Sequence, residues 1–188
     1  MITPRDKQIV DLIGLTGAVK ASHIERVFMQ NNKQGRNIAE RRLKRLYELN
    51  IIRRTRAFIN TEYIYYNKKT LLDHKLTLTE LYVNLHQLSG QILKFQTEQQ
   101  LGDIRPDAVC DYLYNNNVYQ FLIEIHLATI PFNQSKYDSF YEAGKYRQWY
   151  KVFPRVLIVS DRDIKLQPSR IKYIQIPISC QEINRILK

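Results

Sequence analysis

The 188-residue sequence is poor in cysteine and histidine: Cys110 and Cys180 are its two cysteines, and its four histidines are scattered. Two cysteines are too few for a disulfide framework or a cysteine-based zinc site, so a reducing, cytoplasmic compartment is expected. The sequence also lacks any apolar run near the ~18 residues that a membrane span needs, and its start lacks a signal-peptide pattern. There is no internal repeat and no low-complexity segment. The remaining composition, 44% hydrophobic and 25% charged, predicts one ordinary globular domain or two small ones.

Acidic residues are scarce in the first part of the chain. The whole sequence carries a net charge of +11, and residues 1–75 hold 16 Lys and Arg against 7 Asp and Glu. The rest of the chain holds 13 against 11, so its charge is nearly balanced. Charge concentrated in one half predicts a polyanionic partner for that half, with double-stranded DNA the leading candidate. A membrane surface is the weaker one, because no basic amphipathic helix with a broad apolar face is present.

Three helices are predicted in this basic part. Thr3, Pro4 and Asp6 form a helix start, and the glycines from position 14 to 17 end that helix. Ser22 and Glu25 predict a capping box that opens a short second helix over 24–29. The third helix is expected over 37–49. Its predicted core positions are Ala39, Leu43, Leu46 and Leu49.

Two strands, over 51–58 and 62–66 with a turn at 60–61, follow the helices. Three helices and a basic hairpin predict a winged helix-turn-helix domain over 1–68, in which the third helix enters the major groove and the hairpin lies along the DNA backbone. A solvated basic helix in a protein-binding module is the alternative. The residues expected to contact DNA are Arg36, Asn37, Arg41, Arg42, Lys44, Arg45, Arg53, Arg54 and Arg56.

Residues 69–90 are predicted to be a helical linker, with helices over 70–76 and 79–88 and Thr79 as a cap. Residues 91–188 are predicted to form a second domain. Its elements, in the order strand, strand, helix, strand, strand, helix, indicate a mixed sheet flanked by helices, with the first of these helices running from 133 to about 150. The predicted fold class is therefore α+β.

The most informative segment is a predicted hairpin, residues 105–114 and 118–126 around three asparagines. Asparagine tolerates the positive φ of tight hairpin turns. If pairing is symmetric about the Asn115–Asn116 junction, Asp107 lies opposite Glu124 on the same face, and alternation adds His126. Two carboxylates and an imidazole would suit a divalent cation. The alternative is that these acids are ordinary solvated strand residues; Glu98 is a further acid that could join the group.

Three segments together resemble the replication-relaxation family of plasmids, phages and integrative conjugative elements. They are the arginine-rich helix at 39–46, Ile104-Arg105-Pro106-Asp107-Ala108, and Phe121-Leu122-Ile123-Glu124-Ile125. The resemblance covers residues from about 5 to 162. It implies that the second domain is similar to the restriction-endonuclease-like fold, whose motif is Pro-Asp, a gap, and Glu-x-Lys.

Carried over to this sequence, the resemblance implies that Asp107 and Glu124 are metal ligands for Mg²⁺ or Mn²⁺. His126 stands where active nucleases of that fold have a catalytic lysine, and imidazole is a different chemical group that is mostly neutral at pH 7. Lys136, at the start of the following helix, could substitute for it, contact phosphate, or be solvated. Catalytic residues, if the domain cleaves DNA, are therefore expected among Asp107, Glu124, His126 and Lys136.

Three functions stay open. The first is a DNA-binding accessory factor for replication or conjugative transfer, with a second domain used for binding or assembly and with replication or relaxosome proteins as partners. The second is a metal-dependent DNA endonuclease. The third is a transcription regulator whose second domain senses a ligand or dimerises, and a homodimer would follow by analogy with other winged helices. A relaxase with a tyrosine nucleophile is disfavoured, because the histidines form no His-hydrophobic-His pair.

Overall fold

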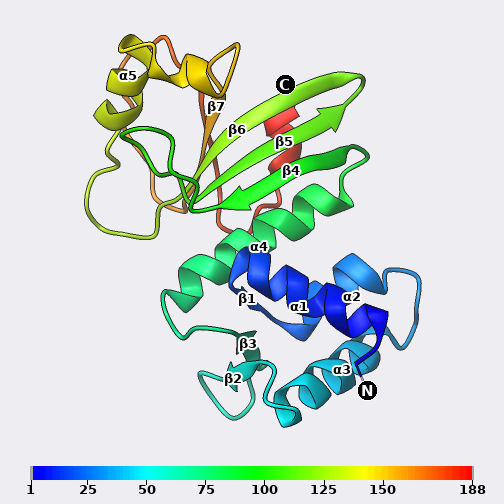
Figure 1. Cartoon of the computed structure of the whole chain (residues 1–188). Coiled ribbons are helices and arrows are strands. Elements are labelled where there is room, and N and C mark those ends of the chain that lie inside the picture. The colour runs from blue at the N-terminus through cyan, green and yellow to red at the C-terminus, as the bar shows by residue number, and fades with distance from the viewer. Residues whose placement is uncertain (1, 188) are drawn as a thin grey trace. The chain divides into compact units, whose positions relative to one another are not determined.

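A computed structural model describes residues 2–187 (Figure 1). Within that range the chain is mixed α+β, with five α-helices and two β-sheets. It divides into two compact units, with the boundary after Gln87. None of the helices within residues 2–187 combines the length and the apolar character that crossing a bilayer demands.

The first unit opens with α1 (Pro4–Thr16), and its two ends confirm the sequence prediction. The Thr3 hydroxyl accepts the Asp6 N–H at 3.2 Å, and the Asp6 carboxylate accepts the Thr3 N–H at 2.9 Å, which is a complete capping box. At the other end Gly17 adopts a φ of +90°, and its N–H donates to the Ile13 carbonyl at 2.8 Å. Local sequence therefore suffices to define this helix.

The next helix, α2 (Ala21–Phe28), starts earlier than predicted. The predicted Ser22–Glu25 capping box is wrong: Ser22 lies inside the helix, and its N–H and hydroxyl donate to the Glu62 carboxylate at 2.8 and 3.1 Å. The first turn of α2 is thus capped by a side chain forty residues further along the chain. At the start of the helix the Lys20 N–H donates to His23 Nδ1 at 3.1 Å.

The third helix, α3 (Gly35–Glu48), starts two residues before the predicted position. Ala39, Leu43 and Leu46 are buried as predicted. Leu49 was predicted to be a core residue, but it is 48% exposed because the helix ends before it.

A three-stranded antiparallel sheet completes the core of the first unit, in the order β1-β3-β2. Its strands are β1 (Ala18–Val19), β2 (Arg53–Thr55) and β3 (Ile64–Tyr66). Both hairpin strands are shorter than predicted, so the loop between β2 and β3 is longer and spans 56–63. Strand β1 was not predicted. Buried residues from all three helices and from the sheet form one hydrophobic cluster, including Ile9, Ile24, Leu43 and Tyr65.

The segment 69–90 was predicted to be a linker with two helices, but it contains one long helix, α4 (Leu72–Gln87). This helix contacts α1, α2 and β1 and belongs to the first compact unit. Thr79 is not a cap: it is buried inside the helix, and its hydroxyl contacts the carbonyls of Ala18 and Lys75 at 2.5 and 2.8 Å.

The second unit is built on a five-stranded mixed sheet in the order β4-β5-β6-β7-β8. Its strands are β4 (Gln91–Thr97), β5 (Ala108–Tyr114), β6 (Asn117–Ile125), β7 (Arg155–Val159) and β8 (Tyr173–Ile176). The β4–β5 and β5–β6 pairs are antiparallel, and the other two pairs are parallel. A mixed sheet was the prediction for this half of the chain, and it is confirmed.

The β5–β6 register is the predicted one. Ala108 pairs with Ile123 and Tyr114 pairs with Asn117, and the two-residue turn between the strands has φ values of 48° at Asn115 and 62° at Asn116. Positive φ at both central residues is typical of the tight turns that suit the twist of a hairpin.

One face of this sheet packs against α5 (Ser135–Glu142). Tyr137 and Phe140 of the helix share a hydrophobic cluster with Val109, Leu122 and Val156 of the strands. The helix was predicted to run to about residue 150, but it ends at Glu142, because Gly144 takes a φ of +65° before a short 3-10 helix, Lys145–Gln148. A second 3-10 helix, Ile183–Leu187, ends the described chain.

Candidate functional site

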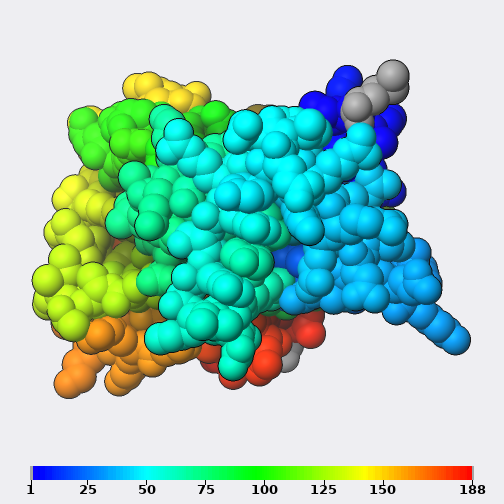
Figure 2. Space-filling model, turned by 90° about the horizontal axis from the view of Figure 1, so that it is seen from below, coloured from blue at the N-terminus to red at the C-terminus, as the bar shows by residue number. Residues whose placement is uncertain are grey.

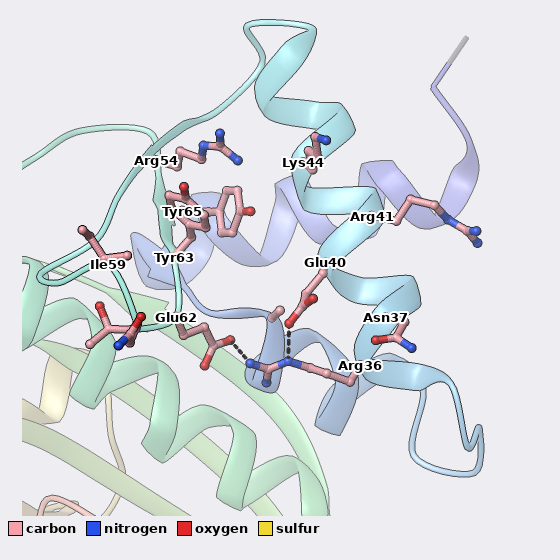
Figure 3. Close-up of a pocket in the computed structure, with 13 residues that line it drawn as sticks. Arg36, Asn37, Glu40, Arg41, Lys44, Arg54, Ile59, Glu62, Tyr63 and Tyr65 are labelled. Carbon is pink, nitrogen blue, oxygen red and sulfur yellow. Dashed lines mark hydrogen bonds and ion pairs between the residues drawn. The ribbon is translucent and has the colours of Figure 1, made fainter.

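Helix α3 presents a basic and amide-bearing face to solvent. Asn37, Arg41 and Lys44 are all exposed, and their spacing of four and three residues places them on one side of the helix (Figure 3). Lys44 forms an exposed ion pair with Glu48, with 3.8 Å between Nζ and Oε1. Such a pair is weak, and its charge stays available to a ligand. Arg45 is also exposed.

Arg36, at the start of α3, is held by two carboxylates. Its guanidinium donates to Glu40 Oε1 at 2.8 Å and pairs with Glu62 Oε1 at 2.9 Å (Figure 3). Burial acts to lower the pKa of Arg36, but these bonds and charges outweigh it and raise that pKa. Because Glu62 also caps α2, one carboxylate joins the β2–β3 loop to two helices. Arg36 was predicted to contact DNA, and in this structure it holds the loop against α3.

Arg42 was predicted to contact DNA, but its side chain is turned into the first unit. Its guanidinium donates to Asp6 Oδ1 at 2.9 Å and to the Thr3 hydroxyl at 3.0 Å, so it fixes the start of α1 to α3. Burial acts to raise the pKa of Asp6, but the bonds from Thr3 and Arg42 prevail and lower it. Helical periodicity explains the difference, because position 42 lies beside the buried Ala39–Leu43–Leu46 stripe.

Of the predicted hairpin arginines, Arg54 contacts a residue of α3. Arg53 and Arg56 are exposed, whereas Arg54 is stacked between the rings of Tyr47 and Tyr63, 4.2 Å from each ring centroid. Cation–π contacts of this kind hold a guanidinium in place without neutralising it. Arg56 lies 4.8 Å from the Tyr63 ring and donates to the Ile59 carbonyl at 2.8 Å.

A pocket of about 630 Å³ lies between α3 and the β2–β3 loop (Figure 3). Asn37, Arg41 and Lys44 line its helix side, and Arg54 and Ile59 line the other. The segment that carries α3 and this loop, coloured light blue to cyan in Figure 2, is exposed on one face of the first unit. Of the residues predicted to contact DNA, the structure thus brings Asn37, Arg41, Lys44 and Arg54 together around this pocket. Arg53 lies on β2 and Arg56 in the loop that follows it. Arg42 is not part of this surface, because it bonds Asp6.

The second predicted site lies on the face of the second sheet that is covered by α5. By the β5–β6 register, Asp107 lies opposite Glu124. Asp107 is two residues from Val109 and Glu124 is two residues from Leu122, so each acid is on the same face of the sheet as a residue that packs against α5. They therefore share a face, as predicted. Asp107 Oδ2 accepts the Ile125 N–H at 2.7 Å, which holds this carboxylate at the end of β6.

Glu124 is engaged by two consecutive residues of α5. The Lys136 ammonium donates to its Oε1 at 2.6 Å, and the Tyr137 hydroxyl donates to the same oxygen. Burial is the main cause that raises the pKa of Glu124, and the charge of Asp107 adds to it, while Lys136 and Tyr137 act in the opposite direction. Burial and the Glu124 charge also raise the pKa of Tyr137, so its hydroxyl stays protonated and donates.

His126 does not complete a metal site. Its Nε2 contacts the Ile130 carbonyl at 3.0 Å, and its ring meets Phe132 edge-on at 5.9 Å. Across residues 2–187 no group of three His, Cys, Asp or Glu side chains is arranged to hold a metal, so the predicted three-ligand cluster is wrong. Glu98 is also separate, because its carboxylate pairs with Arg105 at 2.6 Å on the surface.

What remains is a pair of carboxylates with an ammonium and a phenol. Mg²⁺ often takes one or two protein carboxylates and completes its shell with water and phosphate, so Asp107 and Glu124 are sufficient in number and chemistry. Lys136 would have to release Glu124 Oε1 for a cation to reach it. The contact of Tyr137 with Glu124 was not predicted from the sequence. The available signal was that Tyr137 is adjacent to Lys136, which was predicted to lie near the acids.

Comparisons of the chain with protein-family models, with curated proteins and with solved structures find no match.

Proposed function

We propose that this chain is a DNA-binding accessory factor for the replication or conjugative transfer of a mobile genetic element. The first unit binds duplex DNA as a winged helix, with α3 in the major groove and the β2–β3 loop along the backbone. The observation that carries the proposal is the shared exposed face of Asn37, Arg41 and Lys44 beside the tyrosine-stacked Arg54. The resemblance to the replication-relaxation family supports the cellular role.

Each group on this surface has a defined chemical use. Arg41 can bond a guanine edge in two places, Asn37 can do the same with adenine, and Lys44 supplies a mobile charge for phosphate. Arg54 offers its fork to the backbone from a fixed position, because its two tyrosine neighbours hold its plane. Glu40 and Glu62 pair with Arg36, so its charge is balanced and the DNA contacts are left to Asn37, Arg41, Lys44 and Arg54.

The second unit serves binding or assembly in this proposal. Glu124 is occupied by Lys136 and Tyr137, so it acts as a half-buried polar contact between β6 and α5, while Asp107 binds the backbone of β6. The proposal is tested by fluorescence anisotropy on a labelled random-sequence duplex at low salt. Replacing Arg41 and Lys44 together by Ala should weaken binding at least tenfold, because two phosphate or base contacts are lost.

The matched control removes two positive charges elsewhere. Lys151 and Lys165 are exposed residues of the second unit, and replacing both by Ala changes the net charge equally. This control should bind within about twofold of wild type. Equal binding by the α3 variant and wild type would refute the assignment of α3.

A metal-dependent DNA endonuclease is the second candidate, and one observation favours it. The Lys136 ammonium lies 2.6 Å from Glu124 Oε1, next to an acid pair that shares a face, which supplies the amine that is missing at position 126. Asp107 and Glu124 would hold Mg²⁺ or Mn²⁺, and the ion would supply charge stabilisation at phosphate. This candidate requires that supercoiled plasmid is nicked with either metal and that Asp107→Asn abolishes nicking while the exposed Asp163→Asn does not. Wild-type protein that never nicks across metals and DNA forms is not a nuclease.

A further inference from the structure

The β2–β3 loop carries two large apolar side chains that point into solvent. Phe58 is 74% exposed and Ile59 is 80% exposed, and no other large apolar side chain in the described part of the chain is more exposed than Ile59. Keeping adjacent apolar groups in water is unfavourable, and such groups commonly mark a binding surface. We call residues 57–60 the apolar tip.

The apolar tip is stabilised by hydrogen bonds within the loop. The Phe58 N–H donates to the Thr61 hydroxyl at 3.0 Å, and the Thr61 N–H donates to the Phe58 carbonyl at 3.0 Å. Arg56 donates to the Ile59 carbonyl at 2.8 Å while its guanidinium lies over Tyr63. Because these bonds restrain the loop, less conformational entropy is lost when the tip enters a partner.

The positive charges around the apolar tip indicate a negatively charged partner. Arg53 and Arg54 lie on the strand that leads to it, Arg56 lies at its base, and residues 53–61 contain no acid. Apolar side chains surrounded by arginines complement a groove that is lined by phosphates and floored by base edges. Duplex DNA has this arrangement, and its minor groove is narrow enough to be filled by a loop of this size.

We propose that Phe58 and Ile59 insert into the minor groove as an apolar wedge, unstack a base step and bend the duplex. The inference rests on the proposed DNA binding and adds to it a deformation of the DNA. The arginines beside the tip offset the phosphate repulsion that bending increases. Pyrimidine–purine steps unstack most easily, so the wedge should favour a site with a central TA step.

The test uses the full chain and two 24-base-pair duplexes of equal composition, one with central TA steps and one without them. A 2-aminopurine at the central step reports unstacking, and donor and acceptor dyes at the two ends report bending. Wild type should raise the 2-aminopurine fluorescence severalfold and shorten the distance between the ends on the TA duplex. Phe58→Ala with Ile59→Ala should remove both signals and weaken binding about tenfold, because the apolar burial is lost.

Two control variants and two further measurements make the outcome specific. Phe58→Leu keeps an apolar wedge and should retain most of the signal, whereas Val152→Ala removes an equally exposed apolar residue from the second unit and should change nothing. The slope of log affinity against log salt concentration should be the same for wild type and the Phe58→Ala, Ile59→Ala variant, because apolar contacts release no counterions. Both substituted positions are exposed, and a circular dichroism spectrum identical to that of wild type would verify their fold.

The outcomes separate this inference from the proposed function. Wild type that binds both duplexes without unstacking or bending overturns the wedge and leaves DNA binding intact. Wild type that binds neither duplex overturns both. If the Phe58→Ala, Ile59→Ala variant unstacks and bends DNA as wild type does, the wedge is refuted. A change in the sedimentation of this variant would then show that the apolar tip serves self-association, and weaker association with anionic vesicles would show that it serves membrane binding.

Discussion

Two neighbouring arginines on α3 have opposite roles in the structure. Arg42 bonds Asp6 and Thr3 inside the first unit, whereas Arg41 lies on the exposed face beside the pocket. The sequence could not separate them, because both are arginines in one basic run. The phase of the helix relative to its buried stripe decides which of them faces the core, and an error of one residue in that phase exchanges their roles.

This difference makes a paired prediction. Arg42→Met should lower the free energy of unfolding by about 1–3 kcal/mol, because it leaves the buried Asp6 carboxylate without its charge partner. Arg41→Met should change that free energy by less than about 0.5 kcal/mol and weaken DNA binding instead. Urea unfolding and duplex titration of both variants check it. The reverse pattern would show that the orientation of α3 is wrong.

The acid pair of the second unit gives a prediction for a single pKa. Lys136 lowers the pKa of Glu124 against the larger effect of burial, so Lys136→Met should raise that pKa further. Carboxylate NMR titration of Glu124 measures the change. Lys145→Met, which removes an exposed ammonium paired with Asp103, should leave the pKa where it was. A Glu124 pKa that is unchanged or lower in Lys136→Met would contradict the contact.

At the scale of whole elements, the sequence was most informative where a local rule decides the structure. The start of α1 and the β5–β6 register followed from a few adjacent residues, Thr3 to Asp6 and Asn115 to Asn116. Prediction failed where distant residues decide. The cap of α2 comes from Glu62, and β1 forms because it pairs with β3; neither has a local signal.

Helix α4 shows the same limit. Its helical spacing was predicted, but its place in the first unit depends on contacts with α2 that no linear pattern reveals. Glu80 of α4 contacts His23 Nε2 at 3.2 Å and Arg26 Nη1 at 2.6 Å. Burial acts to raise the pKa of Glu80, but the bonds from His23 and Arg26 outweigh it and lower the pKa from 4.5 to about 2.

The shifted Glu80 predicts a pH-dependent stability. A carboxyl whose folded-state pKa lies below its unfolded value stabilises the fold above about pH 4.5, and this contribution is lost as the pH falls towards about 2. Glu80→Gln should therefore cost on the order of 2–3 kcal/mol at pH 7 and almost nothing near pH 2. Urea unfolding of both proteins across this range measures the difference. An equal difference at all pH values would contradict it, and the exposed Glu48→Gln should show none.

At the scale of the whole molecule, the uneven charge and the division of the fold coincide. The excess of basic residues falls within 1–75, which lies inside the first compact unit. Composition alone predicted a polyanion for that part of the chain, and the structure adds which of its basic side chains are exposed. It also shows that the second unit keeps Asp107 and Glu124 on one face of its sheet, with Glu124 in contact with the α5 lysine and tyrosine.

The most direct test of DNA binding by the first unit is the slope of log affinity against log salt concentration for a duplex. Wild type should show a steep slope, because several phosphate contacts release counterions. The Arg41→Ala, Lys44→Ala variant should have a slope that is smaller by about one, because Lys44 is the phosphate contact that is lost. Identical slopes for the two proteins would contradict the claim that this face of α3 contacts DNA.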